Sequence, residues 1–169
     1  MDDHGKTPVK GGLHAGDTSE EVMPFVYYNV AAGEKIARVS ANMAMAADME
    51  VRASSTATTG AYSSACQRGL PAILMERGGG GKFTDSEVQA YKRDVKNIMI
   101  RMGLLSGEEV HTVQQKNVTR AEYLEAETDG LWYPVFSAGD TFAGGAVLGT
   151  VRDIWGNLLR EYRADYPGI

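Results

Sequence analysis

A wholly apolar run of four residues, Ala72 to Met75, lies between Pro71 and Glu76. Such a run is the form taken by a strand that is buried on both faces of a sheet. Glycines fill positions 78 to 81, and Thr84-Asp85-Ser86-Glu87 then forms a capping box, the usual start of a helix. A buried strand, a glycine-rich loop and a helix in this order predict an α/β fold.

The helix that begins after Thr84 is predicted to end near Gly103. Apolar residues recur along it at spacings of three and four, which is the period of one helix face. This stripe consists of Val88, Tyr91, Val95, Ile98 and Met102. A helix of a globular protein usually turns such a stripe toward the core.

Other segments of the first 110 residues also have periodic patterns. Aromatic and β-branched residues predict a strand over 25–30, and a shorter strand is expected over 49–52. Helical spacing predicts helices over 33–47 and 58–68. Gly69 follows the second helix and suits its left-handed C-terminal position.

The pattern changes beyond Gly107, where short apolar segments alternate with turn residues. Asp129-Gly130 predicts a hairpin that joins strands over 123–127 and 131–136. We therefore expect two parts: an α/β domain over residues 1–110 and a small all-β C-terminal domain over residues 111–169.

Composition excludes several classes of protein. The net charge is −5 and the pI is about 5.2, so the chain has no basic field for a nucleic acid. No apolar stretch approaches the roughly 20 residues of a membrane span, and no secretory leader opens the chain. The single cysteine, Cys66, cannot form an internal disulfide, which favours a cytoplasmic protein.

Glu76 is the first candidate for chemistry. The carboxyl end of a buried strand is where open α/β sheets bind their ligands, and partial burial there would raise the pKa of the carboxyl group toward that of a general base. The alternative is a structural glutamate that pairs with Arg77 or Lys82.

The glycines at 78–81 allow two interpretations. Their backbone amides could approach a phosphate or carboxylate at the start of the next helix, which would make the chain a small-anion binder. The alternative is an ordinary loop. The segment is not a Walker loop, because Phe83 follows Lys82 where that motif has serine or threonine.

His14 is a candidate zinc ligand, since it lies among small residues in Leu13-His14-Ala15-Gly16-Asp17. Asp17 could complete a His-x-x-Asp pair with it. A lone histidine is also commonly an ordinary hydrogen-bonded residue, and both interpretations stay open here.

Several segments in a fixed order resemble one family of enzymes. They are the Leu13–Asp17 segment, Pro24-Phe25-Val26-Tyr27-Tyr28, Gly69-Leu70-Pro71 through Glu76, the four glycines, the helix with Tyr91-Lys92-Arg93-Asp94, and Val147 through Gly156. Together they resemble the succinylglutamate desuccinylase/aspartoacylase family, which are zinc-dependent amide hydrolases. The resemblance implies a carboxypeptidase-like mixed sheet with helices, present in part.

The resemblance also implies roles for individual residues. His14 becomes a zinc ligand, and Glu76 becomes the base that takes a proton from water and returns it to the leaving amine. Tyr62 and Arg68, on the preceding helix, become candidates for binding a small N-acyl amino-acid-like substrate.

The chain departs from the family in its metal ligands. The family takes two further zinc ligands from an upstream His-x-x-Glu motif, and this sequence contains no such motif. It therefore resembles a partial chain, with weak or no activity alone. The alternative function is a noncatalytic binding or assembly module that keeps the fold. An unpaired sheet edge in such a partial chain would favour a homo-oligomer.

Overall fold

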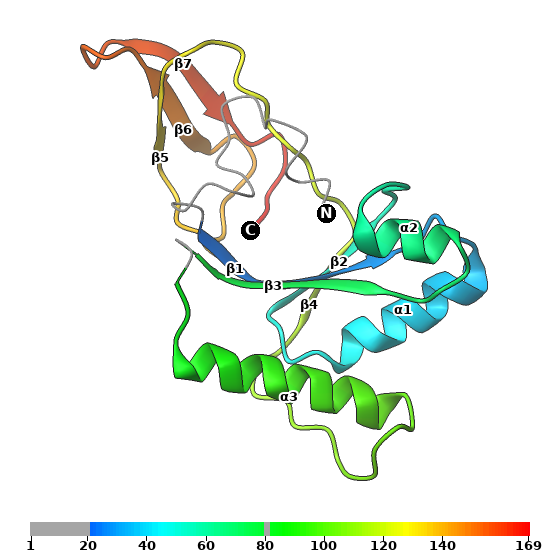
Figure 1. The fold of residues 1–169 in the computed structure, drawn as a ribbon. Helices are drawn as coiled ribbons and strands as arrows, with labels where there is room; N and C mark the ends of the chain where they lie inside the picture. The colour runs from blue at the N-terminus through cyan, green and yellow to red at the C-terminus, as the bar shows by residue number, and fades with distance from the viewer. Residues whose placement is uncertain (1–20, 80–81) are drawn as a thin grey trace.

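The computed structural model describes residues 21–79 and 82–169, which form two β-sheets and three helices (Figure 1). The strands are β1 (Glu21–Asn29), β2 (Val51–Ser55), β3 (Ile73–Gly79), β4 (Lys116–Val118), β5 (Leu131–Pro134), β6 (Val147–Arg152) and β7 (Leu158–Arg163). The helices are α1 (Glu34–Ala46), α2 (Ala61–Gln67) and α3 (Asp85–Arg101). No helix of the described part is long and apolar enough to cross a membrane.

The first sheet is mixed and has the strand order β3-β1-β2-β4. β1 runs parallel to β2 and antiparallel to β3, while β2 runs parallel to β4. This arrangement confirms the predicted mixed α/β architecture. Its fourth strand comes from residues 116–118, so the sheet draws on the chain beyond residue 110.

Two helices, α1 and α3, cover one face of this sheet, and α2 lies on the other (Figure 1). The fully buried cluster between the sheet and α1 contains Val26, Ala44, Ala47 and Met49. Strand β3 adds Ile73 and Met75 to the same side. Side chains alternate between the two faces of a strand, so Phe25, Tyr27, Leu74 and Glu76 belong to the opposite face.

The predicted helices are confirmed with small shifts of their ends. Thr84 caps α3 as the sequence indicates: its hydroxyl accepts the Glu87 amide, and the Glu87 carboxylate accepts the Thr84 amide. Gly69 follows α2 with φ of +85°, the left-handed value that ends a helix.

Strand β3 differs from its prediction in length and burial. It continues through Glu76 to Gly79, because β1 also extends toward its N-terminus and pairs Glu21 and Val22 with Gly79 and Gly78 beyond a bulge. All seven residues of β3 are half-buried rather than buried on both faces. Glu76 therefore lies inside the strand and not at its end.

The apolar stripe of α3 does not form its buried face. The fully buried side chains of this helix are Asp94 and Asn97, while Val95 is 47% exposed and Met102 is 39% exposed. Asp94 is drawn inward by an ion pair with Arg77. Polar contacts with the protein interior thus set the rotation of α3.

The second sheet is antiparallel and has the order β5-β6-β7. Its strands β6 and β7 are joined by a turn at Asp153–Asn157, consistent with the turn residues there. The predicted hairpin at Asp129-Gly130 is wrong, because residues 123–127 form no strand and β5 pairs with β6. Gly130 instead lets the chain approach β6: a Cβ there would lie 2.5 Å from Val151 Cγ1.

Candidate functional site

Glu76 lies on the sheet face that α1 and α3 leave uncovered. Its Cα partner across the ladder is Phe25, and Tyr27 is two residues further along β1 on the same face. The rings of Phe25 and Tyr27 meet edge to face with centroids 5.0 Å apart. The carboxylate of Glu76 is thus held beside an aromatic surface on a regular strand.

Tyr27 has two further tyrosines and Glu76 in its surroundings. Burial raises the pKa of Tyr27, and a hydrogen bond with Tyr123 raises it further. The phenol of Tyr62 and the charge of Glu76 also raise the pKa of Tyr27. Tyr27 therefore stays protonated at neutral pH, and its hydrogen bond with Tyr123 joins β1 to the segment that follows β4.

Helix α2 is tied to the end of β1, which explains how Tyr62 reaches this group. The side-chain amide of Asn29 donates to Ala57 O at 2.6 Å and to Ser63 Oγ at 3.4 Å. Both Asn29 and Ser63 are fully buried. These bonds place the N-terminal turn of α2, which carries Tyr62, above β1.

Arg68 is not part of the same group. It is the exposed C-cap residue of α2, and its backbone amide donates to the last carbonyls of that helix. Of the two candidates for substrate contact, Tyr62 is the one that contributes to the raised pKa of Tyr27, as Glu76 also does. Arg68 stands at the other end of the helix.

The neighbour of Glu76 in sequence, Arg77, points to the opposite face. Its guanidinium donates to Asp94 Oδ2 at 2.7 Å and to the Asp48 carbonyl at 2.8 Å. It also lies over the ring of Tyr91, 5.6 Å from the centroid. The Arg77 side chain thus packs on the face of the sheet that α1 and α3 cover.

The start of α3 already holds a carboxylate of its own. Glu87 accepts hydrogen bonds from the amide and the hydroxyl of Thr84. A Cβ added at Gly78 would lie 3.1 Å from Glu87 Oε1, so this carboxylate packs directly against the strand end. The interpretation of this glycine segment as an anion site is weakened, because Glu87 takes the helix N-terminus.

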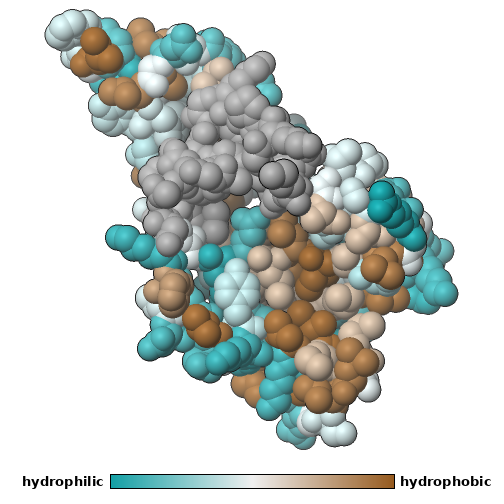
Figure 2. Space-filling model, viewed as in Figure 1, coloured by the Kyte–Doolittle hydropathy of each residue, from teal (hydrophilic) through white to brown (hydrophobic). Residues whose placement is uncertain are grey.

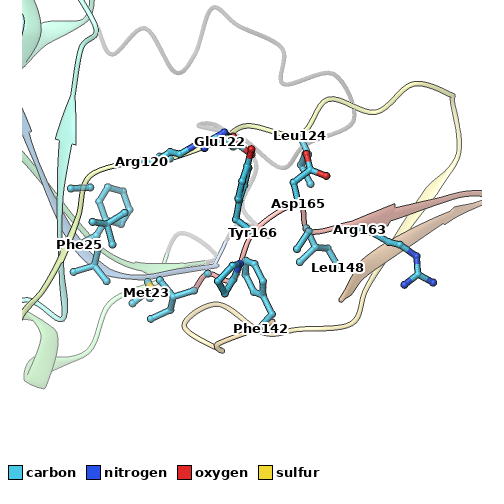
Figure 3. A pocket seen from close by; sticks show the side chains of 18 of the residues that line it. Met23, Phe25, Arg120, Glu122, Leu124, Phe142, Leu148, Arg163, Asp165 and Tyr166 are labelled. Atoms are coloured by element: carbon cyan, nitrogen blue, oxygen red, sulfur yellow. Dashed lines mark hydrogen bonds and ion pairs between the residues drawn. The ribbon is translucent and has the colours of Figure 1, made fainter. Parts of the chain in front are cut away.

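A cleft of about 480 Å³ separates the first sheet from the second, as Figure 3 shows. Phe25 and Tyr27 form part of its floor, and Phe142 and Leu148 line it from the second part of the chain. It also contains charged residues, Arg120, Glu122, Arg163 and Asp165.

Among the charged residues of this cleft, Arg120 has two contacts that fix the position of its side chain. Its guanidinium stacks on the ring of Tyr166, 4.1 Å from the centroid, and it forms an ion pair with Glu122. Sequence reasoning missed Arg120, Tyr123 and Tyr166. No local pattern singles them out, because Arg120 and Tyr166 meet in the cleft only in the folded chain, and Tyr123 is recognised only by its hydrogen bond with Tyr27.

A catalytic zinc ion needs three protein ligands and an open position. Within residues 21–79 and 82–169, no group of three or more His, Cys, Asp or Glu side chains could hold a metal. The predicted ligand His14, together with Asp17, lies outside the described residues. The described part of the chain does not by itself fit a zinc ion.

Comparison with solved structures identifies the fold. No protein-family model matches the chain. The product-bound structure of the ectoine utilization protein EutE (DoeB) from Ruegeria pomeroyi superimposes with a TM-score of 0.76 at 22% identity. The superposition covers 88% of this chain and 47% of the EutE chain. A succinylglutamate desuccinylase/aspartoacylase from Rhodobacter sphaeroides gives a TM-score of 0.76 at 20% identity, over 92% of this chain and 50% of that one.

The chain has the fold of about half of a succinylglutamate desuccinylase/aspartoacylase. The predicted resemblance to this family is confirmed. A curated relative, the N-alpha-acetyl-L-2,4-diaminobutyric acid deacetylase of Halomonas elongata, is 25% identical over 166 residues. The alignment covers 93% of this chain and 48% of the deacetylase, so the chain spans about half the length of the relatives it matches.

Proposed function

We propose that this chain contributes to the hydrolysis of an N-acyl amide bond in a small amino-acid-like substrate, with Glu76 as the general base. The observation that carries the proposal is the position of Glu76 on the sheet face opposite α1 and α3, across the ladder from Phe25 and close enough to Tyr27 for its charge to raise the pKa of that phenol. The shared fold with succinylglutamate desuccinylase/aspartoacylase proteins supports the same chemistry.

In this proposal Glu76 accepts a proton from the attacking water and passes it to the leaving nitrogen. The acyl carbon–nitrogen bond breaks, so that the products are a carboxylic acid and a free amine. A positioned carboxylate suits both transfers, because the same group serves first as base and then as acid. Tyr27 is protonated at neutral pH and adds no competing charge to the site.

Zinc is the cofactor we propose, with His14 as one ligand. A bound zinc ion lowers the pKa of water to about 7 and polarises a carbonyl oxygen. The described residues do not supply the three ligands of such a site. The remaining ligands must therefore come from outside them, and we expect weak or no activity from the isolated chain.

For the substrate, we propose an N-acetylated amino acid as the first class to test, because the Halomonas elongata relative is named as a deacetylase of N-alpha-acetyl-L-2,4-diaminobutyric acid. Tyr62 is the better supported substrate-binding residue, since Tyr62 and Glu76 both act on the pKa of Tyr27. Arg68 is retained as a second candidate. The buried free thiol of Cys66 agrees with the cytoplasmic location that we propose.

The test compares the wild-type chain with Glu76→Gln in assays of amine release from N-acetyl amino acids, with zinc present. Glutamine keeps the size of the side chain and removes the base. We expect any measurable rate to fall by at least roughly 100-fold, the usual contribution of a general base. Glu50→Gln, an exposed residue before β2, is the matched control and should leave the rate unchanged. A measurable wild-type rate that is unchanged in Glu76→Gln would refute the role of Glu76.

The second candidate is a noncatalytic binding or assembly module. It is favoured by the lack of a three-ligand metal cluster in the described part of the chain. Elemental analysis of purified protein separates the two functions. About one zinc per chain, lost in His14→Ala, would support the hydrolase. A stably folded chain without zinc or hydrolysis would support the module.

A further inference from the structure

The cleft between the two sheets begins directly beside Glu76. Phe25 lines the cleft and is the cross-strand partner of Glu76, so the Cα atoms of these two residues lie about 5 Å apart. Val51 is the partner of Phe25 on β2, and it lines the cleft as well. Cross-strand partners share one face of a sheet. One row of side chains therefore leads from the Glu76 carboxylate into the cleft.

The walls of the cleft are largely apolar. The next row of the same sheet face adds Tyr27, Ala53 and Val118 to the floor. The second part of the chain faces this floor with Phe142 and Leu148, as Figure 3 shows. Small-molecule sites usually have volumes of roughly 300 to 1,000 Å³ and mostly apolar linings. The cleft, with about 480 Å³, has the size and the lining of such a site.

The charged side chains of the cleft disfavour a second charge on the bound group. Arg120 pairs with Glu122, and Arg163 pairs with Glu161. The other charged side chain of the described lining is Asp165, which is acidic. A carboxylate on the acyl group, as in a succinyl group, would meet two engaged arginines and further negative charge. Burying it there would be costly, because a buried charge needs a partner of its own.

The volume of the cleft exceeds the volume of an acetyl group. At about 30 Å³ per heavy atom, which is the volume of a water molecule, acetyl occupies about 90 Å³ and octanoyl about 270 Å³. The floor spans β1, β2 and β4, which is about 10 Å at the usual spacing of strands. An extended, apolar acyl chain therefore suits the cleft better than a short one.

We propose that this cleft is the acyl-group subsite of the proposed hydrolase, and that it selects a neutral, apolar acyl group such as octanoyl over acetyl or succinyl. The inference rests on the proposed function for the role of Glu76, since the cleft determines which acyl group reaches that residue. Each methylene group that leaves water for an apolar surface adds to the affinity. The longer chain should therefore bind more tightly.

Isothermal titration calorimetry of the full chain would test this preference with three amides of one amino acid: N-octanoyl-alanine, N-acetyl-alanine and N-succinyl-alanine. We expect N-octanoyl-alanine to bind at least roughly tenfold more tightly than the other two. The titration measures binding without turnover, so its outcome is independent of catalysis. The proposal is overturned if N-octanoyl-alanine does not bind, or if it is not the tightest of the three.

Two matched variants identify the surface that binds the chain. Apolar side chains also gather over the C-terminal half of α3 (Figure 2), around a separate groove that Leu105 lines. Leu124→Asn, at a 49% exposed position of the cleft, should weaken the binding of N-octanoyl-alanine by at least roughly threefold. Leu105→Asn, at a 42% exposed position, should leave the affinity unchanged. A loss of affinity in Leu105→Asn alone would place the acyl chain on α3 and overturn the proposal.

Leu148→Trp narrows the cleft from the side of the second sheet. It should weaken the binding of N-octanoyl-alanine more than that of N-acetyl-alanine, and circular dichroism would check that the fold is kept. A loss of N-octanoyl affinity in Leu148→Trp or in Leu124→Asn supports the subsite. Unchanged affinity in both variants would overturn it.

Glu76→Gln separates this inference from the proposed function. The variant should keep the wild-type affinity for N-octanoyl-alanine, because the chain binds on the apolar floor. Retained binding together with an unchanged rate of hydrolysis would refute the base and leave the subsite. A rate that falls as expected, in a protein without preference for the longer chain, would refute the subsite and leave the base.

Discussion

Arg77 Nη2 lies 2.7 Å from Asp94 Oδ2, in an ion pair whose carboxylate is fully buried and whose guanidinium is 9% exposed. Asp94 also accepts the backbone amide of Asp48 at 2.7 Å. The pair joins β3 to α3 on the face of the sheet opposite to Glu76. The scaffold of the candidate site therefore depends on a pair of charges that is almost completely shielded from solvent.

Replacing Asp94 by alanine should be strongly destabilising. Breaking a buried pair leaves an uncompensated charge, which typically costs about 3 to 5 kcal/mol. Urea denaturation would measure the change in the free energy of unfolding. Glu161→Ala is the comparison, because its pair with Arg163 is exposed and should contribute less than about 1 kcal/mol. Similar losses in the two variants would contradict this assignment.

Asp48 should make stability depend on acid pH. Burial alone would raise the pKa of this carboxyl group, but hydrogen bonds from Thr112, Val113 and Arg93 outweigh it and lower the pKa to about 2. The ordinary value is 3.8, so the folded state binds the proton less tightly than the unfolded state does. The stabilisation is present above about pH 4 and is lost as the pH falls through 2.

The size of this effect is about 2 kcal/mol, from the difference between the two pKa values. Unfolding experiments at several pH values between 2 and 5 would measure the slope. Asp48→Asn removes the titrating group, so its own slope over this window should be smaller than that of the wild type. Parallel slopes would show that another group controls acid unfolding.

Thr84→Ala should destabilise α3 by about 1 kcal/mol, the usual contribution of an N-cap side chain. The variant loses the hydroxyl that accepts the Glu87 amide at 3.3 Å. Thr84→Ser keeps the hydroxyl and should stay within a few tenths of a kcal/mol of the wild type. Thermal unfolding of the three proteins would provide the comparison.

Gly149→Ala should disrupt the second sheet. A Cβ at this position in β6 would lie 2.3 Å from Trp132 Cη2 and 2.7 Å from the Tyr133 carbonyl oxygen. Forced overpacking of this kind typically costs about 1 to 3 kcal/mol. Trp132→Leu removes the larger obstacle, so the double variant should be less destabilised than the sum of the two single variants. Strict additivity would contradict the contact.

Local sequence patterns predicted the elements whose determinants are local. The capping box at Thr84 and the left-handed Gly69 depend on neighbouring residues, and both are present in the structure. The extension of β3 could not be predicted, because it depends on pairing with β1, about fifty residues earlier. The hairpin predicted at Asp129-Gly130 was wrong for the same reason, because β5 pairs with β6, a strand later in the sequence, and not with residues 123–127.

The candidate site was predictable only in part. The pattern around Glu76 made this carboxylate a candidate, but it placed the residue at the end of the strand and did not indicate Tyr27 or Tyr123. Tyr123 reaches Tyr27 from almost a hundred residues away in the sequence, and no spacing rule connects them. The rotation of α3 about its axis could not be predicted either, because the apolar periodicity does not indicate that Asp94 pairs with the buried Arg77.

The Arg77–Asp94 ion pair also determines which side chains of β3 lie on the sheet face opposite α1 and α3. Side chains alternate along a strand, so a slip of one residue against β1 would turn Arg77 upward and bury Glu76 among apolar side chains. Such a slip would separate Arg77 from Asp94 and leave two charges unmatched. The Arg77–Asp94 pair thus disfavours the alternative pairing of β3 with β1, and it keeps the carboxylate of Glu76 on the face opposite α1 and α3.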